Sequence, residues 1–91
     1  MGKLFEDDVS SLTAPGVEGG FGVLAKHAPA VFALKKGVLK ITKDAHDKFY
    51  TVGPGFFEMN QQNQALILVN AALEASNFED AKEKIASIDK V

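Results

Sequence analysis

Turn-forming residues interrupt the first three quarters of this 91-residue chain at short intervals, which limits it to short secondary-structure elements. Groups of glycine, proline, asparagine or other hydrophilic residues fall at positions 14–16, 19–20, 27–29, 36–37, 43–48, 53–55 and 60–63. Most of the segments between them have four to eight residues and are rich in Val, Ile, Leu and Phe. Such segments are typical of β-strands.

Several of these segments alternate apolar and polar residues, with the period of two expected of a half-buried strand. In residues 38–42, Leu39 and Ile41 share one face while Lys40 lies on the other. We expect strands near residues 9–13, 21–24, 31–34, 38–42, 49–52, 56–59 and 66–69. This series predicts a mainly β fold, a small antiparallel β-sandwich or a barrel.

The last part of the chain has a different pattern, which predicts one short C-terminal α-helix over residues 78–87. Residues 76–79 form a capping box, and apolar residues recur at helical spacing at Phe78, Ala81, Ile85 and Ile88. Because so short a helix is marginal in water, we expect its apolar stripe to dock on the sandwich or on a partner. The chain thus divides into a β-sandwich domain at 1–75 and a helical segment at 76–91.

The charged residues argue against nucleic acid as a partner. All ten cationic residues are lysines, there are twelve acidic residues, and the net charge is −2. Such a chain lacks both the positive field that attracts phosphates and the arginines that bind them in bidentate fashion. The chain also has no cysteine, which excludes disulfides, thiolate metal sites and a cysteine nucleophile.

Hydropathy predicts no membrane-spanning helix. The longest wholly apolar run, residues 28–34, has seven residues, whereas a spanning helix needs about 20. The first eight residues contain one lysine followed by acids and no apolar segment, so we expect no secretory signal. These features predict a protein that does not itself insert into a membrane.

No group of residues predicts catalysis or a bound metal or cofactor. The glycine-rich residues 16–22 match no phosphate-binding pattern and are better explained as a turn. His27 and His46 stand without cysteine or carboxylate partners at ligand spacing, and the acids at 6–8 read as a solvated turn. We therefore expect a non-catalytic protein.

Some predicted strands carry apolar side chains on both faces, although a two-sheet sandwich buries only the inner face of each sheet. Residues 28–34, 56–57 and 66–69 show this pattern. The short helix can cover one outward face, and a second protein surface is the economical cover for another. The alternative is a scatter of exposed apolar residues of the kind that most proteins carry.

Three stretches resemble one known family in register. Residues 13–29 read TAPGVEGGFGVLAKHAP, residues 33–41 read ALKKGVLKI, and residues 52–59 read VGPGFFEM. They resemble the APG-x-EG-x-FG, AL-K-x-G and GG-F-x-E-V motifs of the epsilon-subunit family of F-type ATP synthases. The resemblance covers about residues 4–75.

The resemblance implies a ten-stranded β-sandwich at the foot of the central stalk of a proton-translocating ATP synthase. Such a subunit is a non-catalytic rotor part of the F1 complex, which couples the c-ring to the gamma shaft during ATP synthesis. It implies a peripheral protein at the cytoplasmic face of the bacterial inner membrane, or at an organellar membrane. The implied partners are gamma and the c-ring, without nucleic acid, membrane insertion or an obligate homo-oligomer.

Two sets of contact residues follow from the resemblance. The loop expected to face the c-ring contains Glu18, Gly19 and Gly20, the last at a position where many family members carry an acid. The segment expected to face gamma contains His27, Ala28, Pro29, Val31 and Phe32. Because family members commonly have threonine at the position of Phe32, we expect its ring to be exposed in the free protein and to anchor gamma.

Two departures from the family bear on its structure. The family begins with a strand ahead of the position of Gly2, so we expect the strand at 9–13 to have an unpaired edge. The family often ends in a helical hairpin that inhibits ATP hydrolysis, so we do not expect inhibition by that route from one short helix.

A third departure concerns nucleotide. Some bacterial members bind ATP through an (I/L)-D-x-x-R-A motif, whose positions correspond to residues 78–83. Here Phe78 is followed by Glu79 in place of Asp, and Lys82 replaces Arg. Glu83 stands where the motif has Ala, so an extra acid lies beside Lys82, which binds phosphate less well than Arg. This combination predicts that ATP does not bind. The competing hypothesis is a free-standing β-sandwich that senses a small ligand or a nucleotide.

Overall fold

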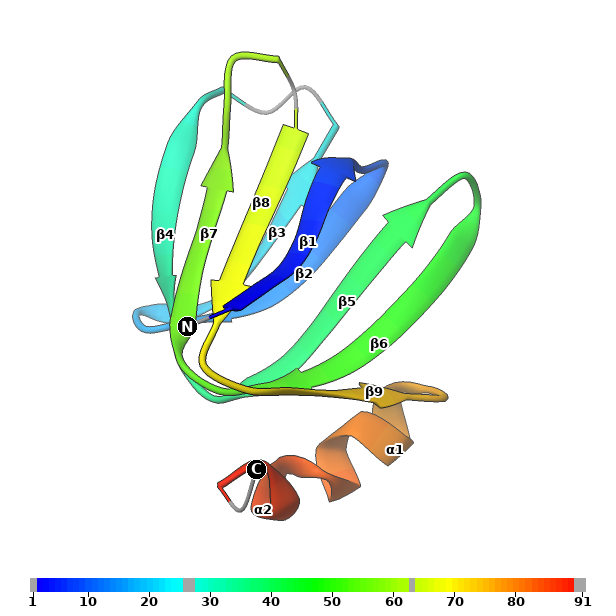
Figure 1. The fold of residues 1–91 in the computed structure, drawn as a ribbon. Coiled ribbons are helices and arrows are strands. Elements are labelled where there is room, and N and C mark those ends of the chain that lie inside the picture. The colour runs from blue at the N-terminus through cyan, green and yellow to red at the C-terminus, as the bar shows by residue number, and fades with distance from the viewer. Residues whose placement is uncertain (1, 26–27, 63, 90–91) are drawn as a thin grey trace.

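The structure is a computed structural model that describes residues 2–25, 28–62 and 64–89. This described part contains nine strands and two short helices (Figure 1). The strands are β1 (Gly2–Asp8), β2 (Ser11–Gly16), β3 (Gly19–Leu24), β4 (Ala30–Leu34), β5 (Gly37–Lys43), β6 (His46–Val52), β7 (Gly55–Met59), β8 (Gln64–Val69) and β9 (Ala72–Ala75). The helices are α1 (Phe78–Glu83) and α2 (Ile85–Ile88). The predicted antiparallel β-sandwich is confirmed.

The strands form two layers, both wholly antiparallel. One layer has the order β1-β8-β7-β4, and the other has the order β3-β2-β5-β6-β9. A single residue pair, Gly16 with Leu34, joins β2 to β4 and makes the path of strands continuous. Figure 1 shows β1, β8 and β7 in front of β2 and β3, with the helices below β9. The result is a barrel-like sandwich with nine described strands where the family resemblance implied ten.

Strict alternation along the strands builds the core between the layers. In β7, Phe57 and Met59 are buried while Phe56 and Glu58 are exposed. In β5, Leu39 and Ile41 are buried, as the alternation in residues 38–42 predicts. Because successive side chains point to opposite faces, each layer contributes one apolar row to the core.

The N-terminal residues are the main correction to the sequence prediction. Residues 6–8 belong to β1, which pairs with β8, and do not form a solvated turn. Strand β2 pairs with β3 on one side and β5 on the other, so the predicted unpaired edge at 9–13 is wrong. The physical reason is that Leu4 and Phe5 of β1 pack against the core, while Lys43 from β5 binds the acids that follow them.

The two acids at the end of β1 are compensated by a lysine from the other layer. Lys43, at the end of β5, donates hydrogen bonds from its Nζ to Asp7 and to Asp8. The hydrogen bond from Lys43, supported by the backbone N–H of Asp8, lowers the pKa of Asp7 from 3.8 to about 2. The same contact raises the pKa of Lys43. This ion pair joins the two layers at the open side of the sandwich.

The C-terminal helix begins at Phe78, as predicted, and is divided in two. Asn77 is the N-cap, and its side-chain oxygen accepts from the backbone N–H of Asp80 at 2.8 Å. Lys84 separates α1 from α2. The Oγ1 hydroxyl of Thr51 on β6 donates to the backbone oxygen of Ala81 at 2.5 Å, so α1 covers the outward side of β6. Docking on the sandwich is confirmed, with Ala81 and Ile88 buried.

We expect Asp7→Asn to lower stability at neutral pH and to lose this effect in acid. The folded-state pKa of Asp7 lies below its ordinary value of 3.8, so its ion pair stabilises the fold fully above about pH 4. That contribution shrinks as the pH falls from about 4 toward about 2, because the carboxyl is protonated first in the unfolded state and then in the folded state. Urea unfolding of the wild type and Asp7→Asn from about pH 6 to about pH 2 measures it. A Glu83→Gln control should show no such convergence, and a constant difference for Asp7→Asn would contradict the assignment.

We expect Gly55→Ala to destabilise the sandwich by about 1–3 kcal/mol, the usual cost of overpacking. A Cβ at Gly55 would lie 1.9 Å from the backbone oxygen of Leu68 on the paired strand β8, so the strands would have to separate. Gly22→Ala is the matched control, because its nearest neighbours are 3.8 Å away. Urea unfolding that places both variants within about 0.5 kcal/mol of the wild type would refute the close approach.

Candidate interaction surfaces

The residues expected to face the c-ring form the tip between β2 and β3, residues 17–20. Gly16 pairs with Gly19, which leaves Val17 and Glu18 as a two-residue turn. Gly19 has a φ of 126°, a conformation that side chains rarely adopt. The backbone N–H of Val17 donates to the oxygen of Ala33 on β4 at 3.0 Å. The tip therefore presents the exposed side chains of Val17 and Glu18 from a backbone that is hydrogen-bonded to β4.

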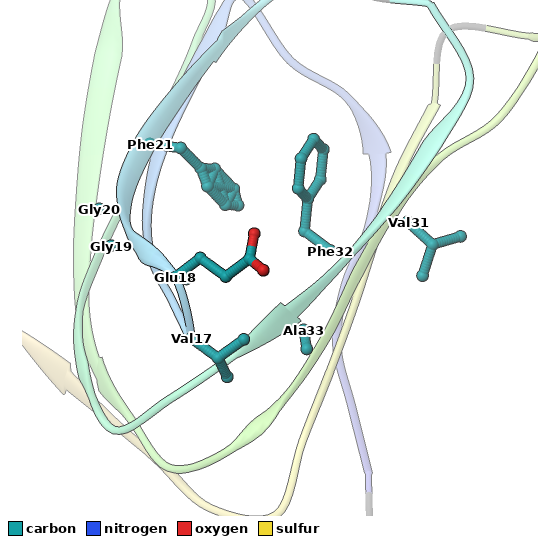
Figure 2. A pocket seen from close by; sticks show the side chains of 9 residues that line it. Val17, Glu18, Gly19, Gly20, Phe21, Val31, Phe32 and Ala33 are labelled. Carbon is teal, nitrogen blue, oxygen red and sulfur yellow. The ribbon is translucent and has the colours of Figure 1, made fainter.

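A pocket of about 450 Å³ lies between this tip and β4. Figure 2 shows the rings of Phe21 and Phe32 facing each other across it, with the side chain of Glu18 below them. The ring centroids of Phe21 and Phe32 are 4.5 Å apart, and that of Phe32 is 5.9 Å from that of Phe57. Strands β3, β4 and β7 thus each contribute one ring to a cluster of three aromatic rings.

The structure corrects the expected exposure of Phe32. Its ring is partly buried and packs against the core, whereas Val31 is 65% exposed and points away from the pocket (Figure 2). Alternation explains the outcome, because Leu34 is buried and a residue two positions earlier in the same strand faces the same way. An aromatic ring at this position is drawn into the apolar interior.

The residues expected to face gamma therefore lie in one segment, but they do not all point to the same side of β4. Ala28 and Pro29 are exposed before β4, and Val31 is exposed on its outward side. Phe32 points inward. His27 lies outside the described residues.

Outward apolar side chains gather on β4, β7 and β8, as the two-sided apolar pattern predicts. We call this set the outer apolar face: Val31, Phe56, Leu66 and Leu68, which surround a shallow hollow of about 200 Å³ together with Glu58. Phe56 is 48% exposed, and the two leucines are half-buried. Sequence reasoning did not single out Glu58, although its place two residues after Phe56 in a strand puts it on the same face.

Two residues at the positions of the family's ATP-binding motif, Phe78 and Lys82, contact each other on α1. Phe78 is 50% exposed, and the Nζ of Lys82 lies 5.6 Å from the centre of its ring. Glu79 is exposed in the first turn. The backbone N–H of Ser76, followed by the side chain of Lys84, lowers the pKa of Asp80. The carboxylate of Asp80 thus stabilises the start of α1.

A metal-binding cluster and a membrane-spanning helix are both absent from residues 2–25, 28–62 and 64–89. Within these ranges no three His, Cys, Asp or Glu side chains gather as a metal would require. In the same ranges no helix has the length and apolar character to cross a bilayer.

Comparisons with known proteins agree on one family. Residues 1–75 match the model of the "ATP synthase, Delta/Epsilon chain, beta-sandwich domain" family. The chain is 38% identical over 84 residues to the ATP synthase epsilon chain of Pelotomaculum thermopropionicum, covering 92% of this chain and 62% of that protein. It is 37% identical over 89 residues to the epsilon chain of Leptospira borgpetersenii, covering 97% and 70%.

The fold also matches a solved structure. A chain in the Euglena gracilis mitochondrial ATP synthase, in a structure of its OSCP, F1 and c-ring, superposes with a TM-score of 0.69. The match has 24% sequence identity and covers 90% of this chain and 51% of that one. At this identity the likeness supports the sandwich fold.

We expect Phe32→Ser to destabilise the fold by about 2–4 kcal/mol, because it removes one of three mutually packed aromatic rings from a partly buried site. Val31→Ser, on the same strand but pointing outward, should cost less than about 1 kcal/mol. Urea unfolding of both variants measures the difference. Equal losses, or a larger loss for Val31→Ser, would contradict the orientation of β4.

Proposed function

The chain belongs to the ATP synthase delta/epsilon chain family, and from this premise we propose that it is a non-catalytic rotor subunit that couples the c-ring to gamma. The match of residues 1–75 to the family's sandwich domain carries the proposal. It is supported by 36–38% identity to several epsilon chains, which the chain matches over 62–72% of their lengths. In this role the subunit transmits torque while other subunits make ATP.

The proposed gamma contact uses the segment before β4 and its outward side. Ala28, Pro29 and Val31 are exposed there, and His27 belongs to the same stretch of sequence. Phe32 supports this contact from the inside, because its stacking holds β4 against the tip. Exposed apolar residues on a hydrogen-bonded strand lose little freedom on binding, which favours a stable contact.

The proposed c-ring contact uses the tip at residues 17–20. Glu18 supplies the charge, while Gly19 and Gly20 let a partner's backbone approach closely. The bond from Val17 to Ala33 fixes the tip relative to the proposed gamma contact on β4. A rigid connection between the two contacts suits a subunit that transmits torque.

The proposed location follows from the role. ATP synthase F1 subunits belong to a peripheral membrane-associated complex, and the similar epsilon chains named above come from bacteria. We place this chain at the cytoplasmic face of a bacterial inner membrane, bound through its partners.

Binding to purified subunits of the same genome tests the proposal. We expect the full chain to form a one-to-one complex with gamma, and titration with Mg-ATP to give no binding. We expect Glu18→Gln to keep gamma binding and to weaken attachment of the gamma complex to the c-ring. Absence of gamma binding together with an ATP dissociation constant in the low micromolar range, roughly −8 kcal/mol, would instead support a free-standing nucleotide sensor.

A further inference from the structure

We propose that the outer apolar face binds an apolar surface of a partner protein that carries one lysine or arginine opposite Glu58. The inference rests on the proposed function, because gamma is the partner with which it is tested. It extends the contact from the segment at β4 across β7 and β8 and names the chemistry that recognises it.

Strand register places Glu58 between apolar side chains. Val31 pairs with Glu58, which pairs with Leu66, so these three residues form one row across β4, β7 and β8. Ala33, Phe56 and Leu68 form the next row. A partner that covers Val31 and Phe56 must therefore also cover the carboxylate of Glu58.

One cation at the edge of this face is already paired. Lys3 on β1 lies opposite Leu68 at the edge of this face, and its Nζ forms an ion pair with Glu6 at 2.7 Å. Among the described residues, Glu58 takes part in no ion pair and no side-chain hydrogen bond. The outer apolar face thus contains one uncompensated negative charge, which a covering surface must either pair or desolvate at a cost.

The charge of Glu58 distinguishes among the molecules that could cover the outer apolar face. A second copy of this chain has a net charge of −2, and its matching face carries the same carboxylate. An anionic lipid surface would be repelled. A purely apolar partner would bury Glu58 without compensation. A protein surface with one cation among apolar residues satisfies both features of the face.

The test measures gamma affinity by calorimetry at low and high salt, with purified gamma from the same genome. Phe56→Ser should weaken binding at least tenfold by removing the most exposed aromatic ring of the face. Glu58→Gln should weaken binding severalfold at low salt and less at high salt, and Glu58→Lys should weaken it further than Glu58→Gln. Leu24→Ser is the matched control, since Leu24 is 72% exposed on β3 in the other layer, and it should stay within twofold of the wild type.

Each variant is first checked by urea unfolding, and the two Glu58 variants keep the test decisive if Phe56→Ser unfolds. If the wild type binds gamma and the Glu58 variants bind equally well, the inference is overturned while the proposed function stands. If Glu58→Lys binds gamma more tightly, the proposal that the partner carries a cation opposite Glu58 is overturned. If the wild type does not bind gamma, the proposed function fails and the inference with it. Loss of self-association in Phe56→Ser, with gamma binding unchanged, would identify a second copy as the occupant and overturn the proposal.

Discussion

The inward position of Phe57 is the constraint on which the rest of this structure depends. Its ring is fully buried, lies 5.9 Å from that of Phe32 and 6.1 Å from that of Phe21, and so connects the core to the pocket at the tip. Because strand residues alternate, an inward Phe57 places Phe56 and Glu58 outside. One buried side chain thus determines both how the layers pack and which residues a partner meets.

The sequence predicts the elements whose apolar residues alternate clearly, and it fails where other forces decide. The strands at 38–42 and 56–59 are predicted well, because Leu39, Ile41, Phe57 and Met59 bury in alternation. Strand β1 is missed because Asp7 and Asp8 look like a turn until a lysine from distant β5 compensates them. Such a contact between layers has no local sequence signal.

The candidate surfaces show the same division. Exposure of the tip at Glu18 follows from its glycines, and the apolar outward residues of β4, β7 and β8 follow from two-sided apolar segments. The exposure of Phe32 was predicted wrongly, because a threonine in relatives shows which residues the position tolerates and not where an aromatic ring packs. The position of Glu58 on an apolar face can be inferred only from the strand register, which places it between Val31 and Leu66.

The pairing of β1 with β8 joins the first and the eighth of the nine described strands. During synthesis on the ribosome, β1 therefore has no partner strand until residues 64–69 have left the exit tunnel. The layer that carries the outer apolar face closes through this pairing, and the long loop between the two strands must be ordered before their contacts stabilise it. The nascent chain thus exposes β1 as an unpaired strand until β8 emerges, which leaves the partner-binding layer open to mispairing.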